Sequence, residues 1–217
     1  MSTVYADLRS FTEIKEIVND VYDRFDRLDV LINNAGVYRS ERIITQEGLE
    51  ETFAVNYVTP FLLTNLLLDL LKKGKSARIV NVASRVHSNR FDLDDLQMEN
   101  GYTGVKAYAK SKTALILFTY LLADKLKNTN ISVNCLHPGV INTKLLRSAF
   151  GSHGALLIDG AKTLIFAAIA PEIENISGKY FVNNRSQPSK TITYNKDIQK
   201  ILWKKTEELI KKEFTEL

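Results

Sequence analysis

Short apolar runs alternate along the chain with longer segments in which apolar residues recur every three or four positions. The short runs carry apolar residues on both faces, which is typical of strands buried within a parallel sheet. The longer segments show the period of helices that pack one face against a core. This pattern predicts strands at 28–32, 78–82, 131–136 and 179–182, and helices at 10–25, 49–72, 105–127, 160–170 and from 196 onward.

Two local signals refine the predicted helices. Ser10 and Glu13 have the spacing of a capping box, in which the hydroxyl and the carboxylate satisfy two free N–H groups at a helix start. Pro60 lies inside the segment 49–72. It is expected to kink that helix, because a proline has no backbone N–H to donate.

The alternation of strands and helices over 217 residues predicts one α/β domain, 1–217, with a parallel sheet covered on both faces. Polar clusters follow three of the predicted strands, at 33–36, 83–84 and 137–139. In an open parallel sheet, ligands bind beyond the carboxyl ends of the strands. The sequence therefore predicts one binding site along that edge of the sheet.

Composition and charge narrow the function classes. The net charge is +4, and the lysines of the C-terminal segment alternate with glutamates, which indicates a solvated helix rather than a nucleic-acid surface. The single cysteine, Cys135, excludes a disulfide framework. No apolar stretch reaches the ~18 residues that span a bilayer. We therefore expect a cytoplasmic protein with no membrane or nucleic-acid partner and no metal site.

Two tyrosine–lysine pairs have the spacing of one helical turn: Tyr108 with Lys112, and Tyr102 with Lys106. An alcohol or carbonyl oxygen that loses or gains a proton needs a base or acid beside it. A tyrosine has an ordinary pKa of about 10. A lysine four residues further on shares its helix face and favours the phenolate. The spacing alone does not choose between the two pairs.

Ser84 and Asn56 complete a candidate site around the first pair. Ser84 would hold the substrate oxygen by a hydrogen bond, and Asn56 would hold a water that links Lys112 to solvent. Each residue also has a simpler interpretation. Tyr108 could be a half-buried helix tyrosine, Lys112 and Asn56 surface residues, and Ser84 the cap of its strand.

Five motifs stand in a fixed order along nearly the whole chain. They are Asn-Asn-Ala-Gly at 33–36, Asn56, Asn-Val-Ala-Ser at 81–84, Tyr108-Ala-Lys-Ser-Lys112, and Pro-Gly-x-x-x-Thr at 138–143. In order and spacing, this set resembles the short-chain dehydrogenase/reductase family. Three further features resemble its retinol dehydrogenase-like branch: Asp94-Asp-Leu-Gln97 within a long interval between the serine and the tyrosine, His-Pro-Gly at 137–139, and Gly178-Lys-Tyr-Phe181.

The resemblance implies a role for each matching residue. In the family the tyrosine lies inside a helix and precedes Ser-Lys, which fits Tyr108 and Lys112 and not Tyr102. Tyr108 would be the acid/base, Ser84 would orient the substrate, and Lys112 would also bind the nicotinamide ribose. Asn56 would support the proton relay. The residues expected to contact an NADP or NAD cofactor, of which the resemblance favours NADP, are Asp7, Leu8, Asn33, Ala35, Gly36, Tyr108, Lys112, Pro138, Gly139, Val140 and Thr143.

The 217 residues contain no glycine-rich Thr-Gly-x-x-x-Gly-x-Gly turn, with which the family binds the cofactor's pyrophosphate. The resemblance therefore implies a Rossmann-like doubly wound parallel sheet that is N-terminally truncated, with its first two strands and first two helices missing. Residues 1–8 would be a remnant of strand three with no neighbour to pair with, and 28–32 would be an exposed edge strand. We expect this chain to bind nucleotide weakly and to be poorly soluble.

The leading hypothesis is an NAD(P)-dependent oxidoreductase that acts on a small apolar alcohol or carbonyl compound. The segment 141–160 would cover the substrate, and the alternative is that this segment is ordinary core. The resemblance also implies a homo-oligomer for a full-length chain. The alternative function is that of a truncated, cofactor-deficient protein without catalysis that interacts with partners through its edge strand. The apolar residues of this segment that are expected to cover the substrate are Leu145, Leu146, Phe150, Leu156 and Leu157.

Overall fold

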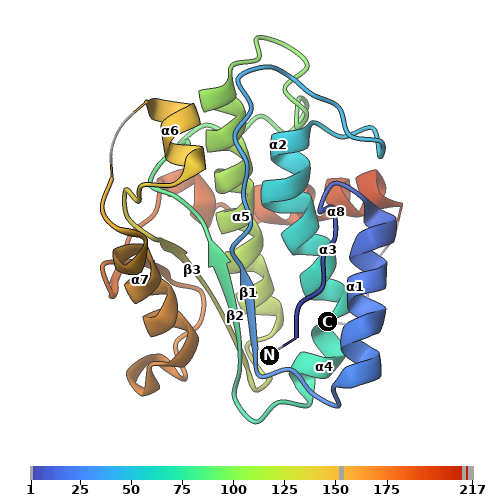
Figure 1. Ribbon diagram of the computed structural model, residues 1–217, viewed down its shortest axis with the longest axis vertical. Coiled ribbons are helices and arrows are strands. Elements are labelled where there is room, and N and C mark those ends of the chain that lie inside the picture. Colours follow the sequence, from blue (N-terminus) through green and yellow to red (C-terminus); the bar gives the residue numbers. More distant parts are fainter. Residues whose placement is uncertain (1, 152–153, 212–213, 215–217) are drawn as a thin grey trace.

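The computed structural model describes residues 2–151, 154–211 and 214, and in them the strands form one five-stranded sheet (Figure 1). The strands from β1 to β4 are parallel, and β5 runs antiparallel to β4. This arrangement confirms the predicted α/β fold with a Rossmann-like parallel sheet. In sheet order the strands are β1 (Val30–Asn33), β2 (Ala77–Val82), β3 (Ile131–His137), β4 (Tyr180–Val182) and β5 (Arg185–Gln187).

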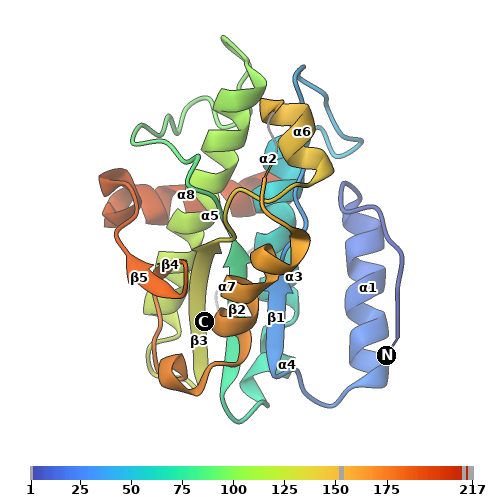
Figure 2. The same ribbon diagram turned by 60° about the vertical axis from the view of Figure 1, so that its left-hand side comes forward.

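Helices cover both faces of the sheet, as the apolar strands require (Figures 1 and 2). On one face α7 packs against β2, β3 and β4, and on the other α5 packs against β2 and β3 and is itself covered by α8. No helix in the described ranges combines the length and apolar character needed to cross a membrane. The helices are α1 (Phe11–Arg24), α2 (Glu51–Phe53), α3 (Thr59–Leu66), α4 (Leu68–Lys72), α5 (Gly104–Lys125), α6 (Lys144–Phe150), α7 (Leu157–Ile169) and α8 (Lys196–Ile210), with a π-helix η1 (Ala54–Val58) and 3₁₀ turns η2 (Pro171–Ile173) and η3 (Thr191–Tyr194).

The predicted helix 49–72 is divided into α2, η1, α3 and α4. The π-helix η1 continues into α3 with helical backbone angles, and Pro60, the second residue of α3, lacks the N–H that would bond to the preceding turn. The helical path breaks at Leu67, whose φ of −94° and ψ of 3° lie outside the helical range. The irregularity near Pro60 was predicted, but the π-helix that carries Asn56 and the break at Leu67 were not.

The N-terminal cap of α1 differs in one detail from the predicted capping box. The Ser10 hydroxyl accepts a hydrogen bond from the Glu13 N–H, as predicted. The Glu13 carboxylate instead accepts from the N–H of Asp7, at 2.7 Å, because the chain turns back before the helix and the Ser10 N–H donates to the carbonyl of Asp7. Residues 2–7 form no strand.

The strand β1 lies at the edge of the sheet, as predicted. Among the described residues it pairs with β2 alone, and Ile32 on it is 37% exposed. A strand edge with unpaired backbone groups and an exposed apolar side chain is a surface on which chains associate.

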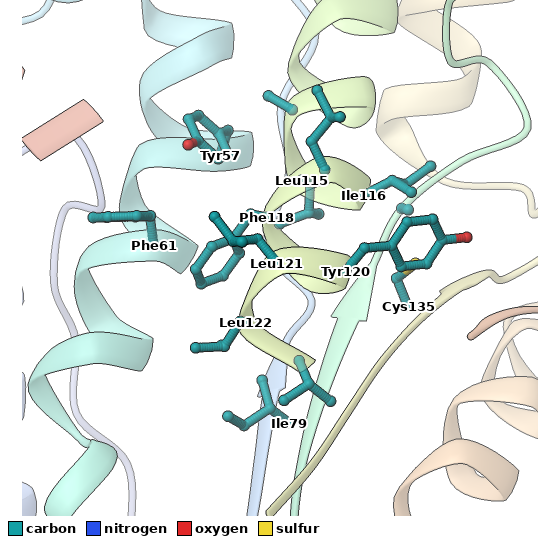
Figure 3. Packing of buried hydrophobic residues seen from close by; sticks show 14 of the residues in the cluster. Tyr57, Phe61, Ile79, Leu115, Ile116, Phe118, Tyr120, Leu121, Leu122 and Cys135 are labelled. Atoms are coloured by element: carbon teal, nitrogen blue, oxygen red, sulfur yellow. The ribbon is translucent and has the colours of Figure 1, made fainter. Parts of the chain in front are cut away.

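The largest apolar core lies between the sheet and the helices α3, α5 and α8. Phe61 is fully buried at its centre, and its ring lies 5.2 Å from that of Phe118 and 4.7 Å from that of Trp203. Figure 3 shows Phe118 pointing across from its helix toward Phe61 and Tyr57. These contacts hold α5 in place, and α5 carries two of the predicted site residues.

Replacing Phe61 with alanine is expected to lower the free energy of unfolding by about 3 to 5 kcal/mol, because the surrounding rings cannot close the cavity. Chemical denaturation measures this change. Phe25 is 49% exposed at the end of α1 and provides the matched control, Phe25→Ala. Equal losses for the two variants would contradict the assignment of Phe61 to the centre of the core.

Candidate active site

A pocket of about 670 Å³ lies beyond the carboxyl ends of β1, β2 and β3. Its wall is formed by the loop after β1, the end of β2, the N-terminal half of α5 and the segment that follows β3. The structure thus brings the three polar strand ends together at one edge of the sheet, as predicted. The volume is within the range of small-molecule sites.

Tyr108 lies on α5 and faces this pocket with 7% of its surface exposed. Burial raises the pKa of Tyr108, because removal from water penalises the phenolate. A hydrogen bond with the Ser84 side chain acts in the opposite direction. The phenol and the serine hydroxyl therefore meet in the pocket, where a substrate oxygen can contact both.

Lys112 lies one turn further along α5 and is 3% exposed. Its ammonium donates a hydrogen bond to the Val82 carbonyl at 2.8 Å and lies 5.7 Å from the centre of the Tyr108 ring. Burial lowers the pKa of Lys112 to about 8. Burial is the largest cause of the pKa shift at both groups and favours the neutral form of each, and the effect of Lys112 on the phenolate of Tyr108 stays a prediction.

Ser84 follows β2 and is 6% exposed. Its Oγ accepts a hydrogen bond from the Val86 N–H at 3.0 Å. This contact is the local cap that the simpler interpretation describes. It also directs the hydroxyl, because an oxygen that accepts from Val86 keeps its own proton for Tyr108 or for a substrate.

Asn56 is fully buried in η1, which excludes its interpretation as a surface residue. Its Oδ1 accepts from the Val37 N–H at 2.7 Å, and its Nδ2 donates to the Val37 carbonyl and to the Ser111 Oγ. The side chain therefore ties the loop after β1 to α5 and has no free donor for the proposed water.

The loops after β1 and β3 form the remaining wall. Ala35 and Gly36 line the pocket, and a Cβ on Gly36 would lie 3.3 Å from the Asn56 Oδ1 and 3.5 Å from the Lys112 Nζ. Glycine at this position leaves the space beside the ammonium open. Four predicted cofactor residues from the second loop also line the pocket: Pro138, Gly139, Val140 and Thr143.

Three predicted cofactor residues lie outside the pocket. Asn33 points into the sheet, where its Nδ2 donates to the Asn81 Oδ1 and the Thr64 Oγ1, and its neighbour Asn34 lines the pocket instead. Asp7 forms an ion pair with Arg9. The Leu8 carbonyl accepts from the Thr59 hydroxyl at 2.7 Å.

The structure also places Tyr102 outside the pocket. Its hydroxyl contacts the Arg39 carbonyl at 3.1 Å and the Glu50 carboxylate at 3.2 Å. It thereby connects the loop after β1 to the residue that caps α2. Burial raises the pKa of Tyr102 to about 12. Of the two tyrosine–lysine pairs, only Tyr108 and Lys112 face the pocket.

Some residues in the pocket wall had no predicted role. His137 lines the pocket, and its Nδ1 accepts from the Arg85 N–H at 3.3 Å. Burial, with the Arg85 charge, lowers the pKa of His137 to about 4, so this imidazole is neutral. Its position at a strand end was the available signal. Val86 was not singled out because nothing in its sequence context marks it.

The segment 141–160 contributes to the pocket only in part. Leu145 and Leu146 line it, whereas Leu156 and Leu157 do not and are 71% and 67% exposed. The side chain of Phe150 lies outside the described part of the chain. The exposure of Leu156 and Leu157 excludes the interpretation of these two residues as ordinary core.

Comparison with known proteins agrees with the family resemblance and with the fold. The model of the short chain dehydrogenase family matches residues 1–152. Human polyprenol dehydrogenase is 41% identical over 95% of this chain and 68% of its own length, and human retinol dehydrogenase 14 is 36% identical over 94% and 65%. The chain thus spans about two thirds of each of these curated relatives. The crystal structure of an uncharacterised protein from Mycobacterium paratuberculosis superposes with a TM-score of 0.76 at 28% identity, over 96% of this chain and 75% of that one.

The buried charge of Lys112 predicts a pH dependence of stability. Between about pH 8 and 10.5, the ordinary lysine pKa, the unfolded chain holds a proton that the folded chain has released. The contribution of Lys112 to stability therefore rises with pH across this window. The stability advantage of Lys112→Met over the wild type should be largest below pH 8. This advantage should shrink by a few kcal/mol as the pH rises from about 8 to 10.5, because each unit of difference between the folded and unfolded pKa corresponds to about 1.4 kcal/mol.

Chemical denaturation of both proteins across that window tests this prediction. Lys106→Met, which removes a lysine from the exposed side of the same helix, is the control. If the difference in unfolding free energy between wild type and Lys112→Met stays constant with pH, burial does not lower the pKa of Lys112 in the folded chain.

Proposed function

Because the chain belongs to the short-chain dehydrogenase family and to its retinol dehydrogenase-like branch, we propose that it transfers hydride between an apolar alcohol and the corresponding carbonyl compound, with NADP or NAD as cofactor. The observation that carries the proposal is the meeting of Tyr108, Ser84 and Lys112 in one pocket. NADP is the form to test first, on the resemblance to that branch.

The residues around Lys112 fit the nicotinamide end of such a cofactor. Gly36 leaves open space beside the buried ammonium, and Gly139 adopts a φ of +99°, which lets the loop after β3 approach a ligand closely. Lys112 would bind the ribose, and Pro138 and Thr143 would hold the ring. When bound, the cofactor supplies or accepts the hydride.

The protein's own residues handle the proton. At neutral pH the raised pKa of Tyr108 keeps the phenol protonated, so it can donate a proton to a carbonyl oxygen that is being reduced. Ser84 lies within hydrogen-bonding reach of Tyr108 and would hold the same oxygen. Lys112 remains mostly cationic below pH 8 and favours negative charge developing on the phenol.

The pocket wall favours an apolar substrate. Val86, Ile141, Leu145 and Leu146 line it together with the polar site residues. Removal of apolar surface from water drives the binding of such compounds. The two relatives are named for retinol and polyprenol, and we propose an alcohol or aldehyde with a comparable hydrocarbon chain.

Replacing Tyr108 with phenylalanine is expected to lower kcat/KM by roughly 100- to 10,000-fold, the usual contribution of a general acid or base. The measurement is the NADPH-dependent reduction of an apolar aldehyde such as retinal, repeated with NADH. Tyr102→Phe is the matched control, because Tyr102 has the same spacing to a lysine but lies outside the pocket. Tyr102→Phe should keep its activity and lose about 1 kcal/mol of stability.

Equal activity of the wild type and Tyr108→Phe would overturn the proposal. The second candidate function, a non-catalytic interaction role through the open edge of β1, predicts that partner binding is unaffected by Tyr108→Phe. Substitution of the exposed Ile32 with lysine would abolish such binding without affecting reduction of the aldehyde.

A further inference from the structure

The imidazole of His87 joins Ser84 to a segment far away in the sequence. Its Nδ1 lies 2.7 Å from the Ser84 carbonyl oxygen, and its Nε2 accepts a hydrogen bond from the Lys190 N–H at 3.0 Å, across 103 residues of sequence. His87 is 9% exposed, and its ring packs edge-on against Tyr180 with centroids 5.5 Å apart.

These two contacts fix the protonation state of His87. A carbonyl oxygen only accepts, so the Nδ1 must carry the proton that it donates to Ser84. A backbone N–H only donates, so the Nε2 must be unprotonated. Burial lowers the pKa of His87, which agrees with a neutral ring.

Further hydrogen bonds hold the far end of this connection. The Ser189 hydroxyl, next to Lys190, bonds to the Tyr120 hydroxyl at 2.7 Å and to the Thr193 hydroxyl at 2.6 Å. The Gln199 side chain of α8 donates to the Thr193 carbonyl at 2.8 Å. The segment that holds the Nε2 of His87 is therefore attached to both α5 and α8.

Tyr120 belongs to the same helix, α5, as Tyr108. The bonds from Ser84 through His87, Lys190 and Ser189 thus return to the helix that carries the phenol. This closed path fixes the serine, on the loop after β2, relative to the tyrosine. A second fixed point lies on the same loop, where the Ser88 N–H donates to the Thr113 hydroxyl of α5 at 2.8 Å.

We propose that His87 is a positioning residue, which locks the backbone of Ser84 through one defined tautomer and so holds the serine hydroxyl at the Tyr108 phenol. The proposal rests on the proposed function, because this alignment affects a rate only if Ser84 and Tyr108 act on a substrate. The alignment itself is a property of the folded chain and can be measured without turnover.

Three substitutions separate the two hydrogen bonds of His87. His87→Phe keeps the ring and removes both bonds. His87→Asn keeps a donor near the position of Nδ1, and His87→Gln keeps an acceptor near that of Nε2. Misplacement of a reacting group by about 1 Å costs up to 100-fold in rate. His87→Phe should therefore lower kcat for the aldehyde by roughly 10- to 100-fold while the KM for NADPH changes little, and His87→Asn should recover more of kcat than His87→Gln.

The Lys190 N–H is tested through its backbone. Lys190 has a φ of −63°, which already suits proline, so Lys190→Pro removes the donor without a change in this angle. Lys190→Ala keeps the N–H and removes only the side chain. Nitrogen-15 NMR of the full chain at neutral pH should show neutral His87 protonated at Nδ1 in the wild type and in Lys190→Ala, and a changed Nε2 signal in Lys190→Pro.

The two measurements have distinct outcomes. A His87 that is protonated at Nε2 alone, or that is an imidazolium at neutral pH, overturns the positioning role whether or not the chain is active. A wild type that reduces aldehyde while His87→Phe retains full kcat overturns it as well. An inactive wild type with the expected tautomer counts against the proposed function and supports the geometry of His87.

Discussion

The hydrogen bond from the Lys112 ammonium to the Val82 carbonyl is the contact on which the site depends. It joins the N-terminal half of α5 to Val82, the last residue of β2, and Ser84 lies two residues beyond Val82. Because the ammonium is removed from water, its placement is tolerated only where a carbonyl replaces the lost hydration. The bond thereby adds a polar contact between α5 and the end of β2, close to both the tyrosine and the serine.

The buried ionisable groups around the pocket share one electrostatic property. Burial raises the pKa of Tyr108 and lowers the pKa values of Lys112, His87 and His137. In every case it favours the neutral form of the group. Both imidazoles are held neutral by hydrogen bonds from backbone N–H groups. In such surroundings a charge that develops on a substrate oxygen is screened little by water, so the few donors directed at it have a large effect.

The sequence predicted the parts of the fold and site that depend on short-range pattern. The strands β1 to β4 and the helix α5 follow from apolar periodicity, and Ser84 follows from polar residues at strand ends. The choice of Tyr108 and Lys112 over Tyr102 and Lys106 came from the family resemblance, and β5 was not predicted. The sequence did not show that the side chain of Asn33 points away from the pocket, because a shift of one residue at a strand end reverses the direction of a side chain. Only its hydrogen bonds to Asn81 and Thr64 show this direction. The bond between His87 and Lys190 joins residues 103 positions apart and leaves no local signal.

The π-helix η1 places Asn56 within reach of both Val37 and Ser111. A π-turn holds one residue more than an α-helical turn of the same path. Loss of one residue from 54–58 would restore a regular α-helix, and the helical residues on either side would keep their orientation because the π-turn holds the extra residue. A single-residue deletion here would therefore displace Asn56 from Val37 and Ser111 while the helical segments on either side stay in place.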